Sequence, residues 1–142
     1  MIVERSRSAG DPSMIEWFVE HAIKVMPELA WAGHAAAVHR IVEATAEVDR
    51  YELVAFVGNE PAGICVLVSE DDAHVGPCLG IMWNFVRPEY SGELGGLFLK
   101  RAIELAKENS LPVMSYTHRV GLGEYRVRYR RLYGQEGKED RR

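Results

Sequence analysis

A glycine-bearing segment carries the most chemical information in this sequence. Residues 80–87 form a nearly continuous apolar run that predicts a buried strand, residues 88–96 predict a loop, and an apolar stripe from Leu94 predicts a helix. A strand that leads through a glycine turn into a helix presents free backbone N–H groups and the positive helix end to an anion. Glycine also lets the backbone approach a phosphate closely. The segment therefore predicts a phosphate-binding loop, and the alternative is a strand-to-helix turn without a ligand.

The cysteines and histidines indicate neither a disulfide nor a metal site. Cys65 and Cys78 both lie in apolar sequence, which is typical of inert core thiols in a domain of this size. His34 and His39 are five residues apart, which is not the i, i+4 spacing that places two ligands on one helix face. We therefore predict no metal-binding residues.

The hydrophobic pattern predicts an α+β fold with the order β-α-α-β-β-β-α-β-α. An N-terminal helix is expected to be capped by Asp11 and to end at Pro27. Because a helix joins strand 80–87 to strand 112–117, these two strands are predicted to be parallel. The other expected strands are 2–5, 52–57 and 62–69, and the other expected helices are 33–48, one ending near Asn109, and 123–133.

Composition and charge place the chain among soluble, single-domain proteins. It has 142 residues, of which 47% are hydrophobic and 27% charged, and its net charge is −4. Residues 118–142 hold eight basic and four acidic residues, whereas residues 1–117 hold nine basic and 17 acidic ones. This asymmetry predicts an anionic ligand or partner near the C-terminal part. No apolar run reaches the roughly 18–20 residues of a membrane span, and no signal core is present, so we expect a cytoplasmic protein.

A nucleic-acid-binding surface is the less favoured interpretation of the basic C-terminal segment. Arginines alternate there with Tyr125 and Tyr129, which gives the mixture of basic and aromatic residues that such surfaces use. On the predicted helix, however, Arg126, Arg128 and Arg130 do not share a face, because positions i and i+2 are about 200° apart.

Several segments resemble the GNAT superfamily of acyl-CoA-dependent N-acyltransferases. Val86–Gly96 is similar to the family motif V-x-P-E-[YH]-R-G-x-G-x-G, and Leu97–Lys107 is typical of the helix that follows it. The hairpin Leu53–Val68 occupies the place of the family's V-A-E-x-D-G-x-x-V-G, and Tyr129–Gly134 resembles the Y-E-K-L-G after its fourth helix. The resemblance implies a GNAT-like mixed central sheet with helices on both faces in a domain 1–134, followed by a charged tail 135–142.

The resemblance also implies a reaction and roles for individual residues. An acetyl-CoA or other acyl-CoA donor would transfer its acyl group to an amine of a small molecule or a protein. Tyr129 would be the general acid for the leaving thiolate, and His118 is a candidate base; the alternatives are a packing aromatic and a polar rim residue. The pantetheine arm would be held by backbone groups of Phe85, Val86 and Arg87. The pyrophosphate would be wrapped by the backbone amides of Gly92, Glu93, Leu94, Gly95 and Gly96.

Two departures from the family pattern support a different hypothesis. Ser91 stands where the family has arginine or glutamine, Leu94 where it has glycine, and Glu93 adds a negative charge beside them. The family's last two strands are expected to be missing, which would leave a sheet edge for a partner chain or a homo-oligomer to cover. The alternative is therefore a catalytically inactive structural or assembly protein. Such a protein would be similar to the GNAT-like proteins that tailed phages encode among their virion genes, and it would then be located in the virion.

Overall fold

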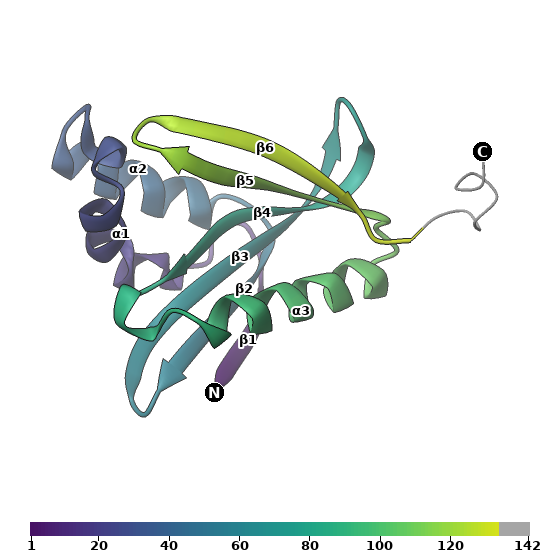
Figure 1. Cartoon of the computed structure of the whole chain (residues 1–142), viewed down its shortest axis with the longest axis horizontal. Helices are drawn as coiled ribbons and strands as arrows, with labels where there is room; N and C mark the ends of the chain where they lie inside the picture. The colour runs from purple at the N-terminus through teal and green to yellow at the C-terminus, as the bar shows by residue number, and fades with distance from the viewer. Residues whose placement is uncertain (134–142) are drawn as a thin grey trace.

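Six strands form one mixed sheet in the computed structural model, which describes residues 1–133 (Figure 1). The strands are paired in chain order from β1 to β6, and every pair is antiparallel except β4–β5, which is parallel as predicted. The fold is α+β, as expected from the sequence. The strands are β1 (Ile2–Arg7), β2 (Arg50–Val57), β3 (Glu60–Asp72), β4 (Gly76–Val86), β5 (Val113–Gly121) and β6 (Glu124–Arg131).

Helices cover both faces of the sheet and bury one core cluster on each. The first face is covered by α1 (Val19–Val25), α2 (His34–Ala46) and the short 3₁₀ helices η1 (Met14–Trp17) and η2 (Pro27–Ala30), and the second by α3 (Glu93–Glu108). A third 3₁₀ turn, η3 (Pro88–Tyr90), follows β4. Within residues 1–133, no helix is long and apolar enough to cross a membrane.

Alternation along the strands explains how one sheet serves two cores. Val54 and Ile64 pack beneath α1 and α2, whereas their neighbours Leu53 and Cys65 pack beneath α3. Both cysteines are buried and free, as the sequence predicted, and burial raises the pKa of Cys65 to about 12. A thiol with so high a pKa is unreactive at neutral pH.

The N-terminal helix differs from the prediction in its cap and its continuity. The segment begins as η1, breaks at Phe18 and continues as α1, which ends at Val25 before Pro27 as expected. Ser13, and not Asp11, is the cap: its hydroxyl accepts the Ile15 N–H at 3.0 Å. The Asp11 carboxylate instead accepts the backbone N–H of Ser8.

The prediction of a helix over 123–133 is wrong, because most of this segment is the strand β6. β6 pairs antiparallel with β5 through a tight turn at Gly123, whose φ of 72° favours glycine. The predicted open edge of β5 is therefore covered by this chain's own backbone, and no fourth helix is present in the part of the chain that the structure describes. The tail 135–142 and the proposed domain boundary at 134 lie outside the described residues.

Candidate functional site

The two parallel strands β4 and β5 separate after only three paired positions. Cys78, Leu79 and Gly80 pair with the first residues of β5, and beyond Gly80 β4 stays with β3 whereas β5 stays with β6. A bulge at Met82 lies just past this point, because Ile81 and Trp83 pair with adjacent residues of β3. Bulges bend a strand and redirect its side chains. The result is an unpaired length of β4 edge in the middle of the sheet, which we call the β4–β5 opening.

Backbone groups of β4 point into the β4–β5 opening. The Arg87 N–H donates to the Ala62 carbonyl of β3 at 2.9 Å. Because successive residues of a strand direct their backbone groups to opposite edges, Val86 and Asn84 direct theirs into the opening. Among the three residues expected to hold a pantetheine arm, Val86 therefore has the free backbone groups, whereas the Arg87 N–H is already used.

The predicted phosphate loop is shorter than expected, because α3 begins at Glu93. Gly92 has a φ of 107°, which favours glycine, and it leads directly into the helix. Gly95 and Gly96 lie inside the first helical turn, where no side chain caps the free N–H groups. A Cβ at either glycine would meet nothing within 4 Å, so the space beside these amides is open. The Leu94 side chain packs against the core beneath α3, whereas Glu93 is exposed.

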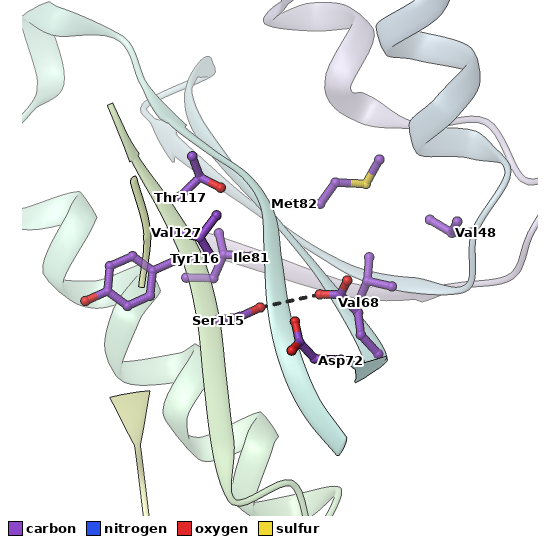
Figure 2. Close-up of a pocket in the computed structure, with 10 residues that line it drawn as sticks. Val48, Val68, Asp72, Ile81, Met82, Ser115, Tyr116, Thr117 and Val127 are labelled. Carbon is purple, nitrogen blue, oxygen red and sulfur yellow. Dashed lines mark hydrogen bonds between the residues drawn. The ribbon is translucent and has the colours of Figure 1, made fainter. Parts of the chain in front are cut away.

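A cavity of about 420 Å³ lies where β4 and β5 separate, on the side of the sheet that carries α1 and α2. Figure 2 shows Asp72 and Ser115 close together in it, with Met82 and Val48 nearer the helical layer. Its charged lining residues are Glu70 and Asp72, and Ser115 and Thr117 contribute hydroxyl groups. Its other lining residues are Val48, Val68, Ile81, Met82, Tyr116 and Val127. The cavity is thus lined by apolar residues together with two carboxylates and hydroxyl groups.

Glu70 lies directly over the last paired residue of β4. A Cβ on Gly80 would be 1.7 Å from Glu70 Oε2, so only glycine leaves room for this carboxylate. The Ser115 hydroxyl donates to Glu70 Oε2 at 3.5 Å. The ion pairs within residues 1–133 include none to Glu70, so its negative charge is available to a ligand.

Asp72 and Tyr129 form a hydrogen-bonded pair at the acidic end of the cavity. The Tyr129 hydroxyl donates to Asp72 Oδ2 at 3.0 Å, and the His74 N–H donates to Asp72 Oδ1 at 2.7 Å. The backbone N–H of His74 is the main reason that the pKa of Asp72 is lowered, so Asp72 is anionic at neutral pH. Desolvation, followed by the hydrogen bond to Asp72, raises the pKa of Tyr129, which therefore keeps its proton. Together with Glu70, this pair makes the cavity suitable for a cation.

The structure does not bring the two predicted catalytic residues together. His118 pairs with Arg126 and lies on the α3 side of β5, whereas Tyr129 pairs with Ser115 and reaches Asp72 on the other side. Sequence reasoning missed Glu70 and Asp72, because both lie beyond the strand predicted over 62–69. Continuing the alternation of Val66 and Val68 through β3 would have placed both carboxylates on one face.

Glu28 of η2 anchors the β5–β6 hairpin to the helical layer. Its carboxylate accepts hydrogen bonds from Arg119 Nε at 2.5 Å and Nη2 at 3.0 Å, and from the Tyr125 hydroxyl at 2.7 Å. Gly123 of the hairpin turn packs so closely on Trp31 that a Cβ would be 2.8 Å from the ring. These contacts tie the turn end of the hairpin, where β5 no longer pairs with β4, to the helical layer.

Replacing Glu28 by glutamine should loosen the hairpin and lower the melting temperature by about 3 °C. Mainly because Arg119 donates hydrogen bonds to Glu28, the pKa of this carboxyl is lowered from 4.5 to about 2. A lowered carboxyl pKa stabilises the fold above pH 4.5, and this stabilisation is lost as the pH falls through 2. Thermal melts of the wild type and the variant should therefore differ at pH 7 and converge near pH 2.

The matched control is Glu47→Gln, which removes the same charge from an exposed residue just after α2. Hydrogen exchange should become faster in β6 for Glu28→Gln and remain unchanged for Glu47→Gln. Equal exchange in both variants would show that Glu28 does not anchor the hairpin.

Comparisons with known proteins identify the fold. No protein-family model matches the sequence, and no curated protein matches it.

Several solved structures match the chain in fold. AAC(6')-Iy, in complex with a bisubstrate analogue of CoA, is 15% identical with a TM-score of 0.52, over 82% of this chain and 78% of that one. A predicted acetyltransferase from Clostridium acetobutylicum with acetyl-CoA is 14% identical with a TM-score of 0.56, over 82% of this chain and 80% of that one. An IAA acetyltransferase from Bacillus cereus is 18% identical with a TM-score of 0.51, over 84% and 67%. The chain therefore has the GNAT fold.

Proposed function

We propose that this protein is an N-acyltransferase that moves an acyl group from acyl-CoA to a cationic amine. The observation that supports this function is the β4–β5 opening. It has an uncapped helix start and a free strand edge for an anionic donor, and an acidic cavity for a positively charged acceptor. Because both features meet where β4 and β5 separate, two substrates of opposite charge would have their reacting ends close together.

The donor side has groups that fit acyl-CoA. The N–H groups of the first turn of α3, beside the open surface of Gly95 and Gly96, would bind the pyrophosphate. The free backbone groups of Val86 and Asn84 would pair with the amides of the pantetheine arm. When bound, acyl-CoA supplies the thioester carbonyl, whose C–S bond breaks as the amide C–N bond forms. Two of the matching structures hold acetyl-CoA or a CoA bisubstrate analogue.

On the acceptor side, Glu70 and Asp72 would hold an ammonium group and manage its protons. The amine nitrogen loses two protons and gains one bond to carbon. We assign the first proton to the Glu70 carboxylate, which releases it to solvent. The second would pass to the Tyr129 oxygen as the Tyr129 hydroxyl proton passes to the departing thiolate. For this step the hydroxyl would turn toward the sulfur from Asp72, to which it donates in the structure. His118, on the opposite face, takes no part in this scheme.

One observation favours a second candidate, a GNAT-fold assembly protein without catalysis. Glu93 is exposed in the first turn of α3, where its negative charge opposes a bound phosphate. Two like charges 4 Å apart repel by about 1 kcal/mol in water. That cost is small beside the binding energy of a whole cofactor, so the acyltransferase remains the favoured function.

Calorimetric titration with acetyl-CoA, followed by an assay of thiol release with spermidine, tests the proposal. We expect a dissociation constant between about 1 µM and 1 mM, and thiol release that depends on the polyamine. A neutral amide such as acetamide should support no release. If millimolar acetyl-CoA produces neither heat nor a thermal shift, the acyltransferase function is wrong and the assembly protein becomes the favoured candidate.

A further inference from the structure

Three arginines of β6 share one face of the sheet. Met114 packs in the core beneath α3, and it pairs with Arg130 in the β5–β6 ladder. Residues paired across antiparallel strands lie on the same face, and the face repeats every second residue. Arg126, Arg128 and Arg130 therefore all lie on the α3 side of the hairpin, and we call them the arginine stripe. The helical arrangement predicted from sequence would have scattered these charges.

The arginine stripe is exposed, and no carboxylate of the described residues pairs with it. Within residues 1–133, none of the three side chains takes part in an ion pair or a hydrogen bond. By contrast, Arg50, Arg87, Arg101 and Arg119 each pair with a carboxylate. Same-face neighbours on a strand are about 7 Å apart, so the three like charges reinforce one another's field. Such a surface attracts a ligand with several negative charges.

The position of the stripe relates it to the β4–β5 opening. β5 and β6 form the margin of the sheet beyond the opening, while α3 lies against β3, β4 and the beginning of β5 (Figure 1). All eight residues of β6 are exposed, so no other described element covers the stripe. A ligand that enters the opening from the α3 side therefore has the first turn of α3 on one side and the stripe on the other. His118, paired with Arg126, lies beside the stripe on the same face.

We propose that the arginine stripe binds the 3′-phosphate of the CoA nucleotide; this inference rests on the proposed acyltransferase function. The first turn of α3 offers backbone N–H groups for the pyrophosphate, but Ser91 and Glu93 supply no positive charge there. The remaining phosphate is a monoester that carries about −1.5 to −2 charges at neutral pH. Arginine binds such a group with two parallel hydrogen bonds. The stripe thus supplies the cations that the loop lacks.

Titrations with CoA and with 3′-dephospho-CoA test the role of the stripe. Wild-type protein should bind CoA about ten times more tightly than dephospho-CoA. The variant Arg126→Gln/Arg128→Gln/Arg130→Gln should bind both ligands equally, with the affinity that the wild type has for dephospho-CoA. Arg5→Gln is the matched control, because it removes one exposed arginine from β1 at the opposite edge of the sheet, and it should retain the tenfold preference.

The possible outcomes separate this inference from the function on which it rests. If neither ligand binds to the wild type, the proposed function fails. If both bind equally well, or if the triple variant keeps the preference for CoA, the role of the stripe is wrong while the function stands. Tighter binding of a single-stranded oligonucleotide than of CoA would also overturn it, in favour of a nucleic-acid surface. Circular dichroism tests whether the triple variant is folded. If it is not folded, the three single variants are titrated in its place.

Discussion

Replacing Glu70 by glutamine is expected to reduce turnover about 100-fold or more while acetyl-CoA binds as before. Glutamine keeps the size of the side chain and its hydrogen bond from Ser115, but it removes the negative charge and the ability to accept a proton. Glu70 lies over Gly80, the last residue of β4 before the two strands separate. A loss confined to turnover would therefore place the proton acceptor at the inner end of the β4–β5 opening. Steady-state kinetics with calorimetry of donor binding measures both quantities.

Two further variants distinguish a catalytic role for Glu70 from a structural one. Asp71→Asn removes the neighbouring charge, which is exposed on the other face of β3, and should leave turnover unchanged. Gly80→Ala places a Cβ where Glu70 Oε2 lies, so it should displace the flexible carboxylate and lower turnover without unfolding the protein. Full activity in Glu70→Gln would remove this residue from the chemistry. Asp72→Asn, by contrast, should mainly raise the KM for the amine.

Elements that bury apolar residues were predicted from the sequence, and β6 was not. α3 repeats its buried residues at helical spacing, and β2 and β3 carry apolar runs, so local pattern and tertiary structure agree. β6 has no buried face, and it carries no apolar run like those of β2 and β3. Its arginines alternate strictly with Tyr125, Val127 and Tyr129, which is the period of a strand. Pairing with β5, a tertiary interaction, determines its conformation.

The two halves of the candidate site differ in the same way. The first turn of α3 is one continuous segment, so its glycines were enough to predict an anion-binding site there. They did not predict the residue at which the helix begins. The acidic cavity is assembled from strands far apart in the chain: Glu70 and Ser115 are 45 residues apart, and Asp72 and Tyr129 are 57 apart. Only the sheet register brings them together. Because residues 123–133 were predicted to form a helix, Tyr129 was not placed on a strand beside β5, and its contact with Asp72 was not predicted.

Replacing Glu52 by alanine is expected to destabilise the fold by about 3–5 kcal/mol, a large fraction of the roughly 5–15 kcal/mol of a typical domain. Glu52 and Arg50 are only 1% and 4% exposed and form an ion pair, and the Ser13 hydroxyl and Met14 N–H donate to the same carboxylate at 2.6 and 3.0 Å. Without Glu52, the guanidinium remains buried with its charge uncompensated. Urea unfolding followed by circular dichroism measures the loss.

The exposed ion pair of Glu4 with Arg101 is the control, and Glu4→Gln should cost no more than about 1 kcal/mol. The double variant Arg50→Met/Glu52→Leu removes both buried charges, yet it should recover only part of the loss. Arg50 also donates to backbone carbonyls, among them those of Val48, Asp11 and Pro12, and methionine would leave these acceptors without a donor. Full recovery would mean that the charge pair alone matters. Partial recovery would show that Arg50 fastens the segment before η1 to the sheet, which keeps in place the helical layer that anchors the β5–β6 hairpin.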